Sequence, residues 1–421
     1  MNLIEMGKRS RSAARLMARA STAQKNELLA RLAQGLQTSA PDILEANQED
    51  LRQGEGRGLT PALLDRLALN PARLESMSAD LLNVAGLPDP VGECFDEQVL
   101  PNGLKVHKQR VPLGVLGVIY EARPNVTIDV AGLALKTGNA SILRGGSETL
   151  RSNQALVRVV RAALLEAGLP PDAVQFIDDT DRARVAELLG LHEYVDLLIP
   201  RGGEALHRFC RENSRIPVIT GGIGICHLFV DESADLEAAL KVIHNAKTQR
   251  PTVCNALDTV LVHREQAAAF IPRLVEHLSP SGVSFRLDPS AVPYTSPEGD
   301  LPRNASLAGP DDFDTEWLSL VLGIRVVEGL DEAITHIEAH STGHSDGILT
   351  RDEANSRRFV AEVDSAAVYV NASTRFTDGS QLGLGAEVAI STQRLHARGP
   401  MGLRELTTYK WVIVGENHVR A

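Results

Sequence analysis

Hydrophobic residues in the first ninety positions recur every three or four residues, the spacing of amphipathic helices. Leucines with this spacing run from Leu28 to Leu36, and Ser21 and Gln24, just ahead of them, have the order of a capping box. Helical patterns cover residues 10–39, 41–51, 61–69 and 76–85. Pro41 and Pro61 open two of these segments, and proline is favoured in the first helical turn. The N-terminal part is therefore predicted to be helical packing without catalytic candidates.

The pattern changes to short strand-like segments between residues 91 and 110. Two predicted strands, 95–100 and 104–110, flank Pro101-Asn102-Gly103, which is a turn signal. A two-stranded ribbon is marginally stable by itself and usually packs on something else. The ribbon is therefore either a contact for a partner subunit or a plain surface hairpin, and this stretch favours neither.

Strand and helix patterns then alternate from residue 111 onward, in the order of a parallel α/β sheet. Predicted strands are 113–120, 140–144, 174–177, 195–200, 217–222 and 226–230, and predicted helices are 125–135, 154–167, 182–189 and 204–213. Ligands of such sheets bind beyond the carboxyl ends of the strands. Those ends include 121–125 and 144–148, each with one arginine, and the turn Arg201-Gly202-Gly203, whose backbone N–H groups can hold a phosphate. This turn lacks the GxGxxG spacing and is a weak signal by itself.

The second half of the chain predicts another α/β unit. Its predicted strands are 256–262, 317–327, 348–350 and 368–371, and its predicted helices are 266–277, 330–338 and 352–362. A stretch rich in proline, glycine, serine and asparagine, 287–312, predicts a surface excursion. A late strand, 406–414, needs the edge of a sheet to pair with.

Cys254 is the first candidate for catalysis. It follows Pro251, which ends the preceding helical pattern, and it precedes the buried strand 256–262, so rigid elements hold it at a junction. Arg250 and Lys247 lie close in sequence and favour the thiolate, the nucleophilic form. The alternative is a small buried hydrophobe, the usual state of a free cysteine.

Composition narrows the class of protein. A chain of 421 residues is too long for one core, so two or three domains are expected. A formal net charge of −11 argues against nucleic acid as a partner. The four cysteines form no CxxC pair, which argues against a zinc site and a disulfide framework and favours a reducing compartment. With no signal-peptide or membrane-length apolar run, we expect a cytoplasmic protein without membrane contact.

A series of motifs runs along nearly the whole chain. In order they are the Gly138-Asn139 turn, Arg144, Gly221-Gly222, Cys254, Glu316-Trp317-Leu318 and the segment 371–376. This series resembles the aldehyde dehydrogenase superfamily. Three longer strings, Tyr120–Asn125, Gln249–Ala256 and His396–Leu403, are closest to the branch that reduces L-glutamyl 5-phosphate.

The resemblance implies an α/β fold with two Rossmann-like parallel-sheet domains and a small β oligomerisation element. The dinucleotide-binding domain would comprise residues 1–96 and 111–225, and the catalytic domain residues 226–402. The ribbon, 97–110, and the C-terminal strand, 403–421, would form the oligomerisation element, which favours the subunit-contact interpretation of both.

The resemblance also assigns the site. Cys254 would be the nucleophile, and its backbone N–H and Asn125 would hold the oxyanion. Glu316 falls where the superfamily has a glutamate on the nicotinamide ribose, and Arg144 where it usually has a lysine on the adenosine ribose. The other predicted cofactor-binding residues are Gly145, Ser147, Arg201, Gly202, Gly203, Gly221 and Gly222, and the predicted substrate-binding residues are Arg123, Arg250, Asn255 and Arg375. No metal site is predicted, and a structural role is favoured for His227 and His344.

Ile219 marks a departure from the broad superfamily. Hydrolysing members have Glu-Leu-Gly-Gly, in which the glutamate prepares a water, whereas this chain has Ile219-Thr220-Gly221-Gly222. We therefore expect NADPH-dependent reduction of L-glutamyl 5-phosphate to L-glutamate 5-semialdehyde, through a Cys254 thioester that exchanges with phosphate. The implied partners are a second copy in a homodimer or homotetramer and glutamate 5-kinase. Two alternatives are an ordinary aldehyde dehydrogenase that forms a free acid and a non-catalytic scaffold.

Overall fold

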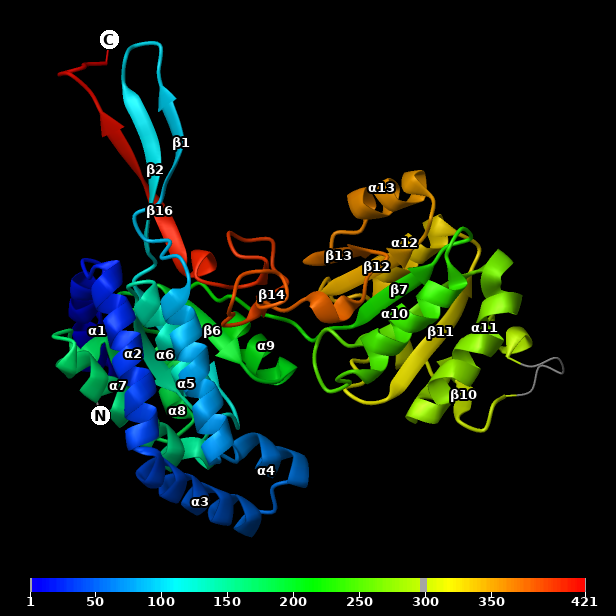
Figure 1. Cartoon of the computed structure of the whole chain (residues 1–421), viewed down its shortest axis with the longest axis horizontal. Helices are drawn as coiled ribbons and strands as arrows, with labels where there is room; N and C mark the ends of the chain where they lie inside the picture. Colours follow the sequence, from blue (N-terminus) through cyan, green and yellow to red (C-terminus); the bar gives the residue numbers. More distant parts are fainter. Residues whose placement is uncertain (1, 296–300, 421) are drawn as a thin grey trace. The chain divides into compact units, whose positions relative to one another are not determined.

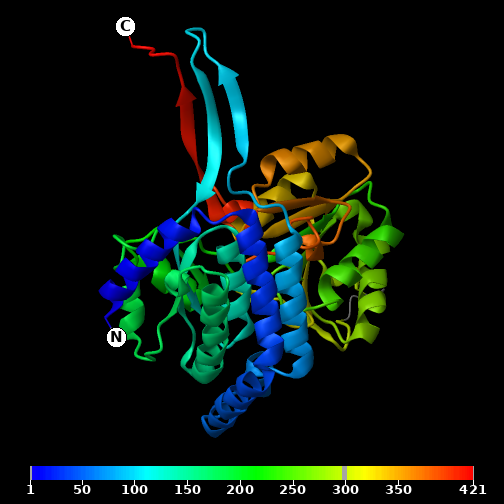
Figure 2. The ribbon, with the colours of Figure 1, turned by 60° about the vertical axis from the view of Figure 1, so that its left-hand side comes forward.

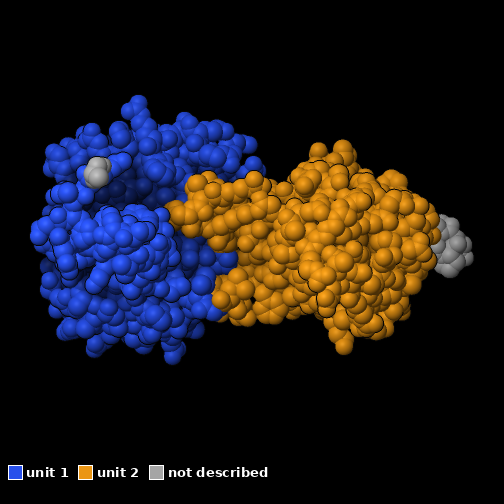
Figure 3. Space-filling model, turned by 90° about the horizontal axis from the view of Figure 1, so that it is seen from above, with its two compact units in different colours: residues 1–220, 383–389, 400–421 blue, residues 221–382, 390–399 orange. Residues whose placement is uncertain are grey.

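The computed structural model describes residues 2–295 and 301–420 and divides into two compact units. Unit 1 comprises 1–220, 383–389 and 400–421, and unit 2 comprises 221–382 and 390–399 (Figure 3). Each unit is a part of the chain whose residues pack mainly against one another. The predicted division into cofactor-binding and catalytic domains concerns function and stays a prediction.

Five helices open unit 1: α1 Leu3–Met17, α2 Thr22–Thr38, α3 Ala40–Gly56, α4 Pro61–Leu67 and α5 Pro71–Gly86. The predicted capping box at Ser21 and Gln24 is confirmed, and the leucines of α2 are fully buried. The predicted segment 10–39 is two helices, because Ser21 caps α2 and so ends any continuous helix there. Helix α5 begins before the predicted residue 76, since Asn70 accepts a hydrogen bond from the N–H of Arg73 at 2.8 Å.

A four-stranded parallel sheet forms the centre of unit 1, in the order β5-β4-β3-β6. Its strands are β3 Val115–Tyr120, β4 Ala140–Arg144, β5 Val174–Phe176 and β6 Leu197–Arg201, and the helices between and after them are α6 Asn125–Lys136, α7 Leu150–Glu166, α8 Ala183–Leu189 and α9 Glu204–Asn213. From β3 the chain builds first toward β5 and then returns to add β6 on the other side. The predicted Rossmann-like parallel sheet is confirmed, and its switch point lies between β3 and β6.

The predicted strand 217–222 is wrong. Only Val218 bridges to the sheet, opposite Leu198. Pro217 has no N–H to donate, and the glycines that follow Thr220 offer no side chain for packing. The chain leaves unit 1 at this point.

A three-stranded antiparallel sheet also belongs to unit 1, with the order β1-β2-β16. Its strands are β1 Cys94–Val99, β2 Lys105–Pro112 and β16 Thr407–Val414, and they extend together from the helices of unit 1 (Figures 1 and 2). The predicted hairpin is confirmed, and Gly103 takes the left-handed conformation that its turn requires, with φ 90°. The late strand predicted at 406–414 is β16, and it pairs with β2. Tyr409, Trp411, Ile413 and Val414 on β16 are exposed.

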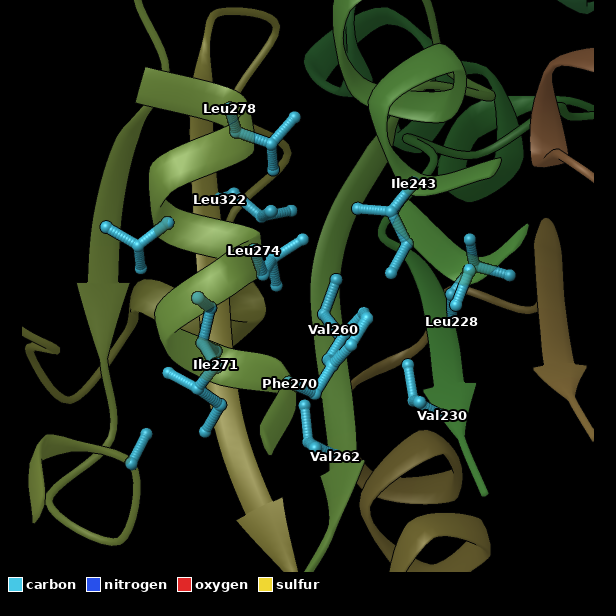
Figure 4. Packing of buried hydrophobic residues seen from close by; sticks show 14 of the residues in the cluster. Leu228, Val230, Ile243, Val260, Val262, Phe270, Ile271, Leu274, Leu278 and Leu322 are labelled. Carbon is cyan, nitrogen blue, oxygen red and sulfur yellow. The ribbon is translucent and has the colours of Figure 1, made fainter. Parts of the chain in front are cut away.

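Unit 2 is built on a seven-stranded parallel sheet with the order β10-β9-β11-β8-β7-β12-β13. The strands are β7 Cys226–Val230, β8 Leu257–His263, β9 Ser284–Leu287, β10 Ala305–Leu307, β11 Val321–Val327, β12 Ser345–Leu349 and β13 Ala367–Val370, and the helices are α10 Leu236–Thr248, α11 Arg264–Leu278, α12 Leu330–His340 and α13 Glu353–Glu362. Two further short strands are β14 Ile390–Ser391 and β15 Gly399–Pro400. In the core, side chains of α11 such as Phe270 and Leu274 pack against the sheet (Figure 4).

Two predictions in unit 2 need correction. The excursion 287–312 is not wholly irregular, because Ala305–Leu307 adds the edge strand β10; residues 296–300 lie outside the described part. The strand predicted from Trp317 begins only at Val321, and the preceding loop holds Leu318 in a left-handed conformation with φ 48°. That loop carries Glu316. In the described part of the chain, every helix is too short or too polar to span a bilayer.

Candidate active site

Cys254 lies on the loop that joins α10 to β8 in unit 2. Helix α10 ends at Thr248, and β8 begins at Leu257. A backbone hydrogen bond of 3.0 Å from the N–H of Ala256 to the carbonyl of Val253 closes a turn around the thiol. Cys254 is half-buried, so the predicted position at a junction between rigid elements is confirmed. Since β8 runs away from this loop, the thiol lies at the amino end of the sheet.

Two arginines flank this loop. Arg250 is exposed, and Arg375, on the short helix η6 Thr374–Phe376, donates from Nε to Oε1 of Gln249 at 2.9 Å. Burial lowers the pKa of Arg375, the charge of Arg250 lowers it further, and Cys254 opposes them. The thiol therefore lies within the electrostatic reach of positive charge, which favours its thiolate.

Asn255 ties the two loops together. Its Nδ2 donates to the carbonyl of Thr377 at 2.9 Å, and its own carbonyl accepts from Oγ1 of Thr374 at 2.7 Å. Its Oδ1 is one of the buried polar atoms that lack a hydrogen-bond partner among the described residues. These bonds hold the segment of Arg375 beside the nucleophile loop. The Asn255 side-chain amide, which was predicted to bind substrate, therefore also has a structural role.

Glu316 lies in the same unit. Its Oε1 accepts a hydrogen bond of 2.9 Å from the N–H of Gly224, 92 positions away in sequence. A Cβ added at Gly224 would overlap the carbonyl oxygen of Cys254, so the backbone passes directly behind the nucleophile. Gly221 is equally constrained, because a Cβ there would overlap the carbonyl oxygen of Ile390, whereas Gly222 is exposed.

The other cysteines have different surroundings. Cys226 is fully buried beside the nucleophile, its Sγ donating to the carbonyl of Cys254 at 3.3 Å, and burial raises its pKa well above the usual value. Burial also raises the pKa of Cys210, to about 11. Cys94 is exposed on β1. Neither buried thiol is activated as a nucleophile.

The predicted cofactor residues of unit 1 lie at the carboxyl ends of its strands. Arg144 ends β4, donates from Nη2 to the carbonyl of Thr180 at 3.2 Å, and has its pKa lowered mainly by burial. Gly145 is buried, and Ser147 is exposed at the start of the short helix η1 Ser147–Thr149. A cationic group and a helical turn therefore lie together beyond β4.

Arg201, Gly202 and Gly203 lie at the switch point between β3 and β6. The N–H of Glu121 donates to the carbonyl of Arg201 at 3.2 Å, and the N–H of Gly203 donates to Oε2 of Glu121 at 3.2 Å. Helix α9 begins at the next residue with no side-chain cap. The first-turn N–H groups of an uncapped helix attract anions. Together with Arg144, this edge fits the phosphates of a dinucleotide.

Asn125 begins α6, also at the carboxyl edge of the sheet in unit 1. Its Nδ2 donates to Oδ2 of Asp129 at 2.9 Å, and burial raises the pKa of Asp129 to about 6. An amide nitrogen has a second hydrogen to donate. Arg123 is exposed, and Ala122 before it is held at φ 42° while its N–H donates to Glu148 Oε1 at 2.7 Å.

The remaining sequence candidates have structural surroundings. Ile219 is buried in unit 1, with its N–H bonded to the carbonyl of Leu198 at 2.9 Å. His227 and His344 are buried in unit 2; Nδ1 of His227 lies 3.1 Å from Oδ1 of Asp346, and burial lowers the pKa of His344 to about 4. Within residues 2–295 and 301–420, His, Cys, Asp and Glu side chains form no group of three that could hold a metal.

Sequence reasoning missed Asp258 and misassigned Lys247. The ammonium of Lys247 is fully buried, donates to the carbonyl of Leu257 at 2.7 Å and lies 3.5 Å from Oδ1 of Asp258. Its ionic partner is thus a carboxylate rather than the thiol. The one available signal was an aspartate interrupting the apolar run 256–262. A charge in a buried strand needs a partner.

Comparisons with known proteins show the family and the fold of the chain. The family model described as "Aldehyde dehydrogenase family" matches residues 3–292. A gamma-glutamyl phosphate reductase from Roseiflexus castenholzii is 58% identical over the full length of both chains. A crystal structure of gamma-glutamyl phosphate reductase from Thermotoga maritima is 49% identical, covers both chains fully and superposes with a TM-score of 0.96. An acetylating aldehyde dehydrogenase from Geobacillus thermoglucosidasius, 17% identical over 99% of this chain and 97% of its own with a TM-score of 0.69, shares the fold.

Proposed function

The chain belongs to the aldehyde dehydrogenase family, and from this premise we infer that it reduces L-glutamyl 5-phosphate to L-glutamate 5-semialdehyde and phosphate, as a step of proline biosynthesis. Relatives that are 56–58% identical and cover 98–100% of the chain are gamma-glutamyl phosphate reductases. Within this chain, the observation that carries the inference is Cys254, a half-buried thiol on a loop flanked by two guanidinium groups.

Cys254 is the proposed nucleophile. Its thiolate attacks the acyl carbon of L-glutamyl 5-phosphate, and the bond from this carbon to the phosphate oxygen breaks. Phosphate departs, and the acyl group remains on Sγ as a thioester. Arg250 and Arg375 are proposed to bind the anionic groups of the substrate, because a guanidinium matches phosphate and carboxylate geometry. The same positive charges stabilise the thiolate before attack and again when it leaves.

A nicotinamide cofactor supplies the hydride that reduces the thioester when it is bound. The oxyanion that forms is assigned to the backbone N–H of Cys254 and to Asn125, whose amide keeps one N–H beyond the bond to Asp129. The oxyanion then forms the C=O double bond of the aldehyde as the C–S bond breaks, so the semialdehyde leaves and the thiolate returns. These roles rest on the family resemblance and on the chemistry of the donor groups.

NADPH is the proposed form of the cofactor. Arg144 ends β4 and Arg201 ends β6, at the edge of the sheet where dinucleotides bind, and an arginine there accommodates a 2′-phosphate. Gly145, Ser147, Gly202, Gly203, Gly221 and Gly222 are proposed to line the cofactor, and Glu316 to hold the nicotinamide ribose. A cytoplasmic location and an association with glutamate 5-kinase stay predictions.

The reverse reaction tests the function, because it distinguishes the reductase from an ordinary aldehyde dehydrogenase. Oxidation of the semialdehyde with NADP⁺, followed as absorbance of NADPH, is expected to require phosphate. Ile219 provides no carboxylate at the position where hydrolysing members have their base, so the thioester waits for phosphate. Sulfate at equal ionic strength is the matched control, and NAD⁺ in a parallel series tests the cofactor preference.

Two results of this assay would overturn the proposal. Full-rate release of free glutamate without phosphate would replace the reductase by an ordinary aldehyde dehydrogenase. No turnover with either nucleotide, from protein that is folded by circular dichroism, would favour the scaffold alternative.

A homo-oligomer formed through β1, β2 and β16 is also proposed. The outer strands β1 and β16 leave edges unpaired within the described chain, and Trp411, Ile413 and Val414 expose apolar surface on one of them. Deletion of residues 406–421 is expected to lower the mass measured by light scattering to that of one subunit. A wild-type protein that is monomeric at micromolar concentration would contradict this proposal.

A further inference from the structure

Asp258 occupies an irregular position in the sheet of unit 2. Cys226 on β7 pairs with Leu257 on β8, and His227 pairs with Thr259, so the register shifts and Asp258 is the extra residue. Such a bulge re-aims a side chain and is frequent next to active sites. The carboxylate of Asp258 is buried, with 2% of the residue exposed.

This carboxylate contacts three segments. Oδ1 accepts a hydrogen bond from the N–H of Trp317 at 3.3 Å and lies 3.5 Å from Nζ of Lys247, and Oδ2 accepts from the N–H of Cys226 at 3.5 Å. Lys247 in turn donates to the carbonyl of Leu257 and so closes the segment 247–257 that carries the nucleophile. The pair is therefore the meeting point of the nucleophile loop, the start of β7 and the loop before β11.

Two of these segments hold Glu316, namely the loop before β11 that carries it and the stretch that leads into β7. Its backbone is anchored one residue later, where the N–H of Trp317 bonds to Asp258. Its side chain is anchored where the N–H of Gly224 bonds to Oε1, two residues before the Cys226 N–H that Asp258 accepts. These two hydrogen bonds, at Trp317 and at Gly224, thus lie next to groups that the Asp258 carboxylate binds.

We propose that Asp258 and Lys247 are positioning residues that hold Glu316 against Gly224 and so set the affinity for the nicotinamide cofactor. This inference rests on the proposed role of Glu316. Neither side chain needs to touch substrate or cofactor. The charges of the pair balance each other in a buried setting, where an isolated charge would be costly.

The electrostatics of the pair show what burial costs. Burial raises the pKa of Asp258 to about 6, against the opposing charge of Lys247, and burial lowers the pKa of Lys247. Removing one partner would leave an unpaired buried charge and destabilise the fold. The informative variant therefore removes both charges together.

The test is the double variant Lys247→Met/Asp258→Leu, which has no unpaired charge but has lost the acceptor for Trp317 and Cys226. We expect the Kd for NADPH, measured by its fluorescence, to rise about tenfold, roughly the worth of one well-made hydrogen bond. In hydrogen–deuterium exchange without cofactor, the amides of Gly224 and Trp317 should exchange faster.

A matched control exists in unit 1. Lys25 and Asp89 form an equally buried pair, 2.5 Å apart with 2% and 5% of their side chains exposed, and Asp89 also accepts from Thr22 Oγ1 and the N–H of Val91. Lys25→Met/Asp89→Leu should leave the Kd for NADPH unchanged. Equal increases in both variants, or none in Lys247→Met/Asp258→Leu, would overturn the proposal.

Glu316→Ala distinguishes the positioning role of Asp258 and Lys247 from the proposed role of Glu316 itself in binding the cofactor. If Glu316→Ala leaves the Kd for NADPH unchanged, the proposed role of Glu316 is wrong. If Glu316→Ala raises the Kd and the pair variant does not, the positioning role is wrong. When both are right, adding the pair variant to Glu316→Ala raises the Kd no further, because the two changes act through one contact.

Discussion

Cys254→Ser is expected to lower kcat/KM by roughly 10³-fold or more, the scale of removing a catalytic nucleophile. A serine hydroxyl at its ordinary pKa is a far poorer nucleophile than a thiolate, and it cannot form the thioester that hydride reduces. Steady-state kinetics with NADPH in the direction of reduction measure the loss. The fold and the Kd for NADPH should stay at wild-type values, since the substitution replaces one atom of a half-buried side chain.

Alkylation provides an independent check on Cys254. Iodoacetamide should modify Cys254 faster than the buried Cys210 and Cys226, and substrate should protect Cys254 but not the exposed Cys94. Cys94→Ser is the matched control and should keep wild-type kinetics. Turnover retained in Cys254→Ser would remove the thiol from the mechanism.

Arg375→Met is expected to lower kcat/KM for the acyl phosphate. A hydrogen bond to a charged group is worth about 1.5–3 kcal/mol, which corresponds to roughly 10- to 150-fold in kcat/KM. Loss of the guanidinium also removes a positive charge near Cys254, so alkylation of the thiol should slow. The kinetics should be measured with both the substrate and phosphate varied, because the affected anion shows the larger increase in KM.

Two controls make the Arg375→Met result specific. Gln249→Ala removes the partner of the Arg375 Nε bond and keeps the guanidinium, so its effect should be smaller. Arg273→Met removes a half-buried arginine of α11 that pairs with Glu237, and it should leave the kinetics unchanged. A kcat/KM for Arg375→Met within twofold of wild type would assign the anion to another residue.

Much of the fold follows from local sequence pattern. The predicted bounds of β4, β7 and α9 match those of the structure, and the capping box of α2 and the turn at Gly103 appear where they were predicted. Each of these features depends on side-chain period or on turn residues within a few positions of one another. The wrong predictions also have local causes. A proline and glycines prevent the segment 217–222 from forming a strand, and the loop after Glu316 makes β11 begin at Val321 rather than Trp317.

The sequence by itself determined the two α/β units, the ribbon and the loop that carries Cys254, because these depend on neighbours in the chain. Only the tertiary structure decided which distant residues meet. Glu316 bonds to Gly224 across 92 positions, Asn255 to Thr377 across 122, and Trp317 to Asp258 across 59. Such contacts depend on strand order and on a one-residue shift in register, and a period along the chain encodes neither. For this reason the sequence predicted that Lys247 favours the Cys254 thiolate, whereas in the fold Lys247 pairs with Asp258.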